Sequence, residues 1–104
     1  MYKPLPESLT IKQSGIDGLG LFAKEGIAQG TNLGMTHIKL NETIMRTPLG
    51  GFINHSNIDN CVKVELLMTD EKNVKFEYKK WNLVTLRDIK EGEELTVRYT
   101  FYKI

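Results

Sequence analysis

The stretch LRDIKEGEELTVRY, residues 86–99, decides the fold. Its KEG turn at 90–92 precedes a run in which Leu95, Val97 and Tyr99 alternate with polar residues. Alternate residues of a strand point to the same side, so these three side chains share one face. The pattern predicts a strand over residues 95–99 with one buried face. On this pattern alone, Tyr99 is an aromatic residue of the core.

An earlier part of the chain echoes this stretch. LFAKEGIAQGTNL at 21–33 aligns with LVTLRDIKEGEEL at 83–95 at a constant offset of 62 residues. Four pairs are identical: Leu21/Leu83, Ile27/Ile89, Gly30/Gly92 and Leu33/Leu95. Each copy has the pattern of a strand, a bend, a buried isoleucine, a glycine turn and another strand. The glycines would supply the positive φ of a tight turn, and we expect two similar β units packed face to face.

Further strands are indicated on either side of these units. Residues 9–13 alternate apolar and polar side chains, and β-branched or aromatic residues concentrate at 62–68, 74–78 and 81–86. The sequence has no long helical periodicity, and the segment 37–45 is compatible with one helical turn. We predict a mostly β domain of short strands.

Length and composition predict a single domain over residues 1–104. The net charge of +1 argues against direct nucleic-acid binding, which usually needs a strongly basic face. No apolar run approaches the ~20 residues that span a membrane, and the opening MYKPLPESLT lacks the features of a signal peptide. We therefore expect a globular domain with no membrane partner and no direct nucleic-acid partner.

Cys61 is the only cysteine, so an internal disulfide is impossible. The simplest inference is a reducing, intracellular and hence cytoplasmic location. We interpret Cys61 itself as a small buried apolar residue. With a single cysteine and only two histidines, His37 and His55, we expect no closed structural zinc site.

Two further motifs carry groups that could bind a ligand. The glycine-rich GIDGLG at 15–20 has neither the order nor the following helix of a dinucleotide fingerprint, and it lacks the lysine of a phosphate-binding loop. It is either a structural hairpin or a stretch of backbone that a ligand can approach closely. In PLGGFINHS at 48–56, Asn54, His55 and Ser56 follow an apolar pair. They are either satisfied structural residues or a polar, ligand-binding patch on a core wall.

Taken together and in this order, the motifs resemble those of the SET-domain family of protein lysine methyltransferases. The matching pieces cover most of residues 9–100 and are GLGLFA (18–23), IAQGTNL (27–33), GFINHS (51–56) and LRDIKEGEELTVRY (86–99). FINHS followed about forty residues later by GEELTVRY is the specific part. The resemblance implies a SET-type β-clip fold, with short strands in several small sheets and a C-terminal knot-like crossing. Compact versions of about this length are known in viruses and bacteria.

The resemblance implies an S-adenosylmethionine-dependent enzyme that methylates a lysine side chain of a protein substrate, without a metal. Tyr99 would be the catalytic tyrosine that lines the channel through which lysine enters, and Glu94 would help to hold the crossing together. Asn54 would bind the amino acid end of the cofactor, and His55 would contact adenine. The remaining cofactor contacts would be the backbone of Gly18, Leu19 and Gly20, and an aromatic lid from Phe101, Tyr102 or another subunit.

The sequence departs from the family pattern in several places. The zinc-binding C-terminal cysteine cluster is absent, and Asn57 stands where a cysteine is common after NHS. Residues 34–50 hold almost none of the usual insert that grips substrate, and no tyrosine between Tyr2 and Tyr78 can supply a second channel tyrosine. These gaps leave the channel short of walls, so we expect self-association, most simply as a homodimer.

The alternative is a non-catalytic β-clip module that binds a cofactor, a carbohydrate or a partner protein. The I-x-x-G-T-x-L turn at 27–33 also occurs in such modules. The NHS and ELTVRY pieces favour the methyltransferase, because a generic binding module has no reason to carry both.

Overall fold

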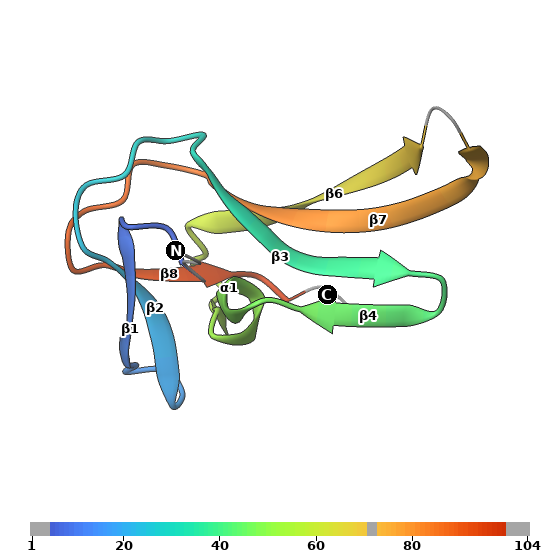
Figure 1. The fold of residues 1–104 in the computed structure, drawn as a ribbon. Helices are drawn as coiled ribbons and strands as arrows, with labels where there is room; N and C mark the ends of the chain where they lie inside the picture. The colour runs from blue at the N-terminus through green and yellow to red at the C-terminus, as the bar shows by residue number, and fades with distance from the viewer. Residues whose placement is uncertain (1–4, 71–72, 100–104) are drawn as a thin grey trace.

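The computed structural model describes residues 5–70 and 73–99 and is mostly β, as the sequence predicts. The elements along the chain are β1 (Leu9–Gln13), β2 (Leu19–Ala23), β3 (Asn32–Leu40), β4 (Thr43–Arg46), α1 (Pro48–Gly51), β5 (Asn54–His55), β6 (Cys61–Asp70), β7 (Asn73–Thr85) and β8 (Glu94–Val97). They form two four-stranded sheets, with strand orders β1-β2-β8-β5 and β4-β3-β7-β6. Figure 1 shows β1 and β2 at one end of the molecule, while β3, β4, β6 and β7 extend toward the other. In the described part of the chain, no helix has the length and apolar character needed to cross a membrane.

The two echoing segments lie side by side in the fold. Ile27 and Ile89 form an isolated antiparallel bridge, in which each backbone N–H donates to the other residue's carbonyl, at 2.9 and 2.8 Å. Gly30 and Gly92 have φ of 80° and 86°, which confirms the left-handed turn predicted for both. The two segments are therefore joined edge to edge by backbone hydrogen bonds, with β2 paired to β8 and β3 paired to β7, rather than packed face to face.

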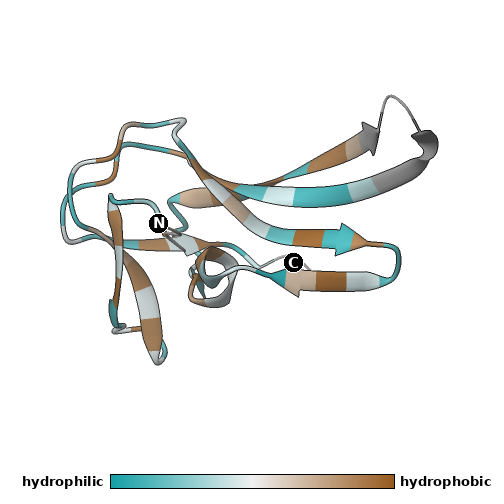
Figure 2. Cartoon of the chain, viewed as in Figure 1, coloured by the Kyte–Doolittle hydropathy of each residue, from teal (hydrophilic) through white to brown (hydrophobic). Residues whose placement is uncertain are grey.

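Both echoing segments contribute to the same hydrophobic core. Leu21, Leu83 and Leu95 have no exposed surface, and Ile89 and Val97 are buried with them. Figure 2 shows apolar and polar bands alternating along several strands, as expected when one face of a sheet is buried. The core therefore joins β2 and β8 of one sheet to β7 of the other.

Cys61 begins β6 and is fully buried. Burial raises the pKa of its thiol to about 12, so the reactive thiolate does not form at neutral pH. The interpretation of Cys61 as a small buried apolar residue is confirmed.

The segment before the Asn54 motif differs from the prediction. Residues 37–45, compatible in sequence with a helical turn, belong to the hairpin of β3 and β4, which turns at Asn41 with a φ of 55°. A helical turn does form, but later, as α1. Thr47 caps α1 by accepting a hydrogen bond from the Gly50 N–H, and Pro48 occupies its first turn, where a missing N–H costs nothing.

The hairpin of β6 and β7 is longer than the sequence predicts. Separate short strands are expected at 74–78 and 81–86, but β7 runs without a break over thirteen residues. Lys79 and Lys80 in its middle are in register with both β6 and β3. Hydrogen bonding to a strand on each side keeps this polar pair extended. The predicted mostly β fold class holds, but the two strands expected at 74–78 and 81–86 are one strand.

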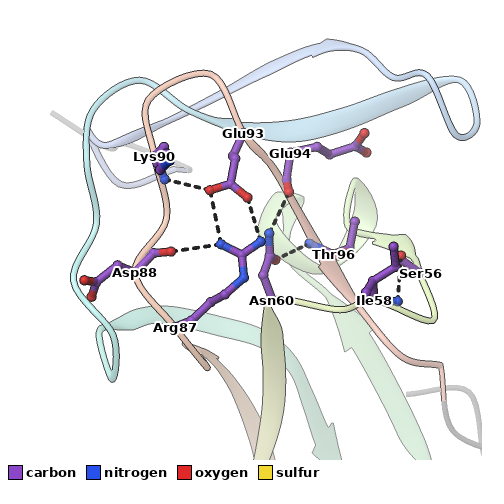
Figure 3. A network of polar contacts seen from close by, with 9 residues as sticks. All are labelled: Ser56, Ile58, Asn60, Arg87, Asp88, Lys90, Glu93, Glu94 and Thr96. Atoms are coloured by element: carbon purple, nitrogen blue, oxygen red, sulfur yellow. Dashed lines mark hydrogen bonds and ion pairs between the residues drawn. The ribbon is translucent and has the colours of Figure 1, made fainter.

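A buried asparagine ties β8 to the start of β6 (Figure 3). Asn60 donates from Nδ2 to the Glu94 carbonyl at 2.9 Å, and its Oδ1 accepts from the Thr96 N–H at 2.8 Å. Its backbone carbonyl accepts from the Leu86 N–H at 2.8 Å. Asn60 therefore pairs backbone groups that β8 would otherwise bury unpaired. On its other side, β8 runs parallel to β5, which sets Asn54 opposite Thr96.

Arg87 and Glu93 brace the turn that leads into β8 (Figure 3). The guanidinium donates to the two carboxylate oxygens at 3.2 and 2.7 Å, and the Lys90 N–H donates to the same carboxylate at 2.8 Å. The Arg87 hydrogen bonds, and then the Lys90 N–H, lower the pKa of Glu93 to about 2. A carboxyl whose pKa falls on folding stabilises the fold above its unfolded pKa. That contribution is lost as the pH falls toward the folded pKa.

We expect Glu93→Gln to flatten the dependence of stability on acid pH. The wild-type protein loses the Glu93 contribution between about pH 4.5 and pH 2, whereas the glutamine variant has no carboxyl to protonate there. Urea unfolding at neutral pH and near pH 3 measures the free energy of unfolding of the wild type and of Glu93→Gln. The difference between the two proteins should be smaller near pH 3. The control is Glu91→Gln, an exposed change in the same turn, which should follow the wild-type curve. Parallel pH curves for wild type and Glu93→Gln would show that this carboxylate does not contribute.

Candidate functional site

β8 lies between β2 and β5, and this order brings the 15–20 loop and the Asn54 strand together. Asn54 Nδ2 donates to the carbonyls of Asp17 and Leu19, at 3.1 and 3.2 Å, and to Glu94 Oε2 at 2.9 Å. One amide thus links three segments that lie far apart in the sequence. This side chain fixes the position of the 15–20 loop relative to β5 and β8.

Glu94 is the charged centre of this polar cluster. Its two carboxylate oxygens accept from the Ser14 hydroxyl at 2.8 and 2.9 Å, and one of them also accepts from Asn54. Gly20 leaves room for the carboxylate, because a Cβ there would collide with it and lie 3.1 Å from Asn54 Nδ2. Close approach of a charged side chain therefore requires the glycine at position 20.

The 15–20 loop leaves part of its backbone accessible. Gly18 has a φ of 46°, and nothing described stands within 4 Å of the place its Cβ would occupy. Leu19 is half exposed. A polar ligand can therefore approach the main chain of residues 18–20 closely, beside the fixed negative charge of Glu94.

His55 links β5 to the residue that follows β8. Its Nδ1 accepts from the Tyr99 N–H at 2.7 Å, so the ring proton belongs on Nε2, which donates to Asn57 Oδ1 at 3.2 Å. The rings of His55 and Tyr99 are tilted against each other, with centroids 5.1 Å apart. His55 therefore helps to set the position of Tyr99 after β8 ends at Val97.

Tyr99 lies beyond β8 and is 47% exposed, so it is not the core aromatic residue that strand alternation alone predicts. Its hydroxyl donates to the Ile53 carbonyl at 2.8 Å. Burial, followed by the negative charge of Asp17, raises the pKa of the phenol, which therefore stays protonated at neutral pH. The phenol oxygen and the Ile53 carbonyl oxygen form a pair of electron-rich atoms.

A cavity of about 650 Å³ adjoins Tyr99. Strands β3, β6 and β7 supply most of its wall, and the end of β8 with the residues after it supplies another part. The charged residues that line it are mostly basic: Lys39, Lys63, Lys79 and Arg98, against Asp59 and Glu65. Tyr99 therefore lines this cavity and is also hydrogen-bonded to His55 and Ile53.

Lys63 reaches from β6 toward Tyr99 within this cavity. Its Nζ lies over the Tyr99 ring, 5.6 Å from the centroid. Burial, and then the positive charge of Arg46, lower the pKa of Lys63. Burial, Lys63 and Arg46 also lower the pKa of His37 to about 4, so that ring is neutral. This part of the protein disfavours additional positive charge.

The site residues predicted from the sequence that fall in the described ranges lie in one cluster: Gly18, Leu19, Gly20, Asn54, His55 and Tyr99. Phe101 and Tyr102, the predicted alternatives for an aromatic lid, lie outside the described residues. The clustering is a precondition for the predicted roles, and the roles themselves stay predictions.

Sequence reasoning missed Ser14, Ile53 and Lys63 as contributors to this site. Ile53 acts through its backbone carbonyl, which no side-chain pattern encodes. For Lys63 a signal was present, because residues two apart in a strand share a face and Cys61 was expected to be buried. Lys63 therefore had to leave β6 on the inner side.

Comparison with known proteins agrees with the architecture. Residues 36–100, more than half of the chain, match the family model of the SET domain. The chain belongs to the SET domain family. No curated protein sequence matches this SET domain. The homodimer expected for it stays a prediction.

A solved structure from Plasmodium falciparum, described as that of a candidate histone methyltransferase, is similar to this SET domain with a TM-score of 0.68. The two sequences are 18% identical, and the match covers 92% of this chain and 96% of that chain. At this identity the likeness shows the SET fold alone.

Proposed function

We propose that this SET domain is an S-adenosylmethionine-dependent protein-lysine N-methyltransferase, with Tyr99 as its catalytic residue. The observation that carries the proposal is the 2.8 Å hydrogen bond from the Tyr99 hydroxyl to the Ile53 carbonyl, beside both the polar cluster and the cavity. Family membership supports it, because SET domains are generally methyltransferases. The similar Plasmodium falciparum protein, described as a candidate histone methyltransferase, points the same way.

The polar cluster suits the amino acid end of the methyl donor. The Glu94 carboxylate is an acceptor matched to an ammonium group. Asn54 uses Nδ2 in its described contacts, which leaves Oδ1 as a second acceptor. The open space at Gly18 allows a ligand to approach the loop backbone. When bound, the donor supplies an electrophilic methyl group on a positively charged sulfur.

The acceptor must be a neutral amine, because an ammonium group has no lone pair. Lysine has an ordinary pKa of about 10.4, so its deprotonation at pH 7 costs roughly 4–5 kcal/mol. The cavity would reduce that cost by withdrawing water and by placing Lys63 and Arg46 nearby. The lowered pKa of His37 illustrates the effect of this environment on a base.

Tyr99 and Ile53 would act on the reacting centre through their oxygens. Methyl transfer is an in-line displacement, so alignment is the main task and contributes up to about 7–11 kcal/mol in good cases. Two electron-rich oxygens, held 2.8 Å apart before the reaction, can orient an amine and stabilise a cationic centre without rearrangement. The phenol hydrogen is committed to Ile53, which leaves the oxygen lone pairs for the amine.

We expect Asn54→Ala to weaken S-adenosylmethionine binding by about 1–3 kcal/mol, because the change removes an acceptor and releases the 15–20 loop. Isothermal titration calorimetry on the purified chain measures this affinity. The matched control is Gln29→Ala, which removes an exposed amide from another turn and should bind normally. Unchanged affinity in a folded Asn54→Ala protein would remove Asn54 from the site. A wild-type chain that binds no donor would refute the cofactor assignment.

Transfer itself is tested with isotope-labelled donor and a cell extract, followed by mass spectrometry of labelled lysines. The expected result is label on lysine side chains of protein that appears only when the chain is added. Donor binding without any transfer would instead favour the alternative, a non-catalytic β-clip module.

A further inference from the structure

We propose that Lys63 is itself a methyl acceptor, modified within its own chain at the point where Tyr99 meets Ile53. The inference rests on the proposed methyltransferase function and names one acceptor for it. Its basis is placement, because Lys63 Nζ lies over the Tyr99 ring, 5.6 Å from the centroid, and both residues line the same cavity of about 650 Å³.

The backbone of β6 directs Lys63 inward. In the antiparallel register of β6 and β7, Lys63 lies opposite Leu83, which is fully buried. Cys61, two positions earlier, is fully buried, whereas the neighbours Val62 and Val64 are each 38% exposed. Side chains alternate along a strand, so Lys63 leaves β6 on the side of the core and the cavity. Its long, flexible stem then lets Nζ move along the Tyr99 ring toward the hydroxyl.

No described carboxylate holds the Lys63 ammonium in place. Glu65, two positions along β6, pairs with Lys79 instead, with 3.7 Å between Nζ and Oε1. The contact described for the Lys63 ammonium is the face of the Tyr99 ring. Burial and the nearby Arg46 lower the pKa of Lys63, which increases the share of neutral amine at a given pH. Only this neutral form carries the lone pair that accepts a methyl group.

The step balances with the methyl donor as the sole co-reactant. The neutral Lys63 nitrogen forms a bond to the methyl carbon while the carbon–sulfur bond breaks, and the electron pair of that bond stays on sulfur, which becomes a thioether. The proton released to water leaves the Lys63 ammonium before the attack, and the methylated nitrogen carries the positive charge afterwards. Because the acceptor is part of the enzyme, no encounter between molecules is required and the reaction is first order in the chain.

The first experiment incubates the purified chain alone with methyl-labelled S-adenosylmethionine and maps the modified peptides by mass spectrometry. We expect label on Lys63 at a rate constant that does not change when the protein is diluted tenfold. Lys63→Arg should abolish that label and keep the charge. The matched control is Lys79→Arg, which alters another lysine of the same cavity wall and should leave Lys63 labelled. Label that depends on protein concentration, or that falls on other lysines while Lys63 stays bare, would overturn the proposal.

The second experiment needs no donor. In protein labelled with ¹³C at the lysine ε carbon, the Tyr99 ring should shift the Lys63 ε-methylene protons upfield, and Tyr99→Leu should return them to the ordinary lysine position. Tyr78→Leu, a change of another tyrosine, should leave the shift in place. An ordinary Lys63 signal in the wild-type chain would mean that the side chain does not lie over the ring, and the inference would fail.

The outcomes also separate this inference from the proposed function. A chain that binds donor and labels lysines of other proteins, but never Lys63, retains its function and loses this inference. A chain that neither binds donor nor labels any lysine loses both.

Discussion

Tyr99→Phe should reduce methyl transfer by about 10²–10³-fold, which is the scale of losing one preorganised polar group. The change keeps the ring beside His55 and Lys63 and removes only the hydroxyl that bonds to the Ile53 carbonyl. Donor affinity should change much less, because the hydroxyl would act mainly in the transition state. Lysine transfer measured at saturating donor, with calorimetry for binding, separates the two effects.

The matched control is Tyr78→Phe, which removes a tyrosine hydroxyl from β7 and should leave transfer unchanged. The folded state should tolerate Tyr99→Phe, since Tyr99 is half exposed and the lost bond is a single neutral one. A folded Tyr99→Phe protein that binds donor and methylates at the wild-type rate would show that Tyr99 is structural. Tyr78 and Tyr102 would then be the next candidates.

Gly50→Ala should destabilise the protein by about 1–3 kcal/mol, because it adds a methyl group where the core has no space. A Cβ at Gly50 would lie 2.9 Å from His37 Cε1 and would collide with the Thr36 carbonyl oxygen, which is part of the β3 backbone. That carbonyl already accepts from the Thr47 N–H at 2.9 Å, so it has little freedom to move. In a domain of this size, each kcal/mol corresponds to a fall of about 4–8 °C in Tm.

The neighbouring glycine is the control for this prediction. A Cβ at Gly51 would meet only Arg46 Nε at 3.9 Å, which is an ordinary contact. Gly51→Ala should therefore be neutral or stabilise the protein by about 0.4–1 kcal/mol, since alanine restricts the unfolded chain. Thermal unfolding followed by circular dichroism compares the two variants directly. Equal Tm values for Gly50→Ala and Gly51→Ala would mean that α1 can shift away from β3 at little cost.

Local features of the fold could be predicted from the sequence because local residues determine them. Gly30 and Gly92 adopt the predicted left-handed turns, and Leu95 and Val97 are buried as their alternation indicates. The unbroken course of β7 through Lys79 and Lys80 could not be predicted in this way. The ammonium groups of these two lysines can reach solvent while their backbone stays in the sheet. The backbone is held there by hydrogen bonds to β3 on one side and β6 on the other.

The candidate site also has features that could be predicted from the sequence and others that could not. The resemblance to the SET family implied one site for the 15–20 loop, Asn54, His55 and Tyr99, and the structure brings these segments together. The oxygen pair of Tyr99 and Ile53 could not be foreseen, because half of it is a backbone atom. The contact of Lys63 with Tyr99 depends on how the fold brings β6 beside the end of β8, which side-chain type does not determine.

The wide sequence separation of the groups around Glu94 has a consequence for how the protein folds and how long it survives. The Glu94 carboxylate accepts hydrogen bonds from Ser14, eighty residues away in the sequence, and from Asn54, forty residues away. Such contacts form only after long loops have closed, so they belong to the late stage of folding. A ligand that binds there stabilises the finished fold and slows unfolding, without speeding folding. For the methyl donor proposed above, a chain saturated with donor should therefore unfold more slowly than the same chain without it.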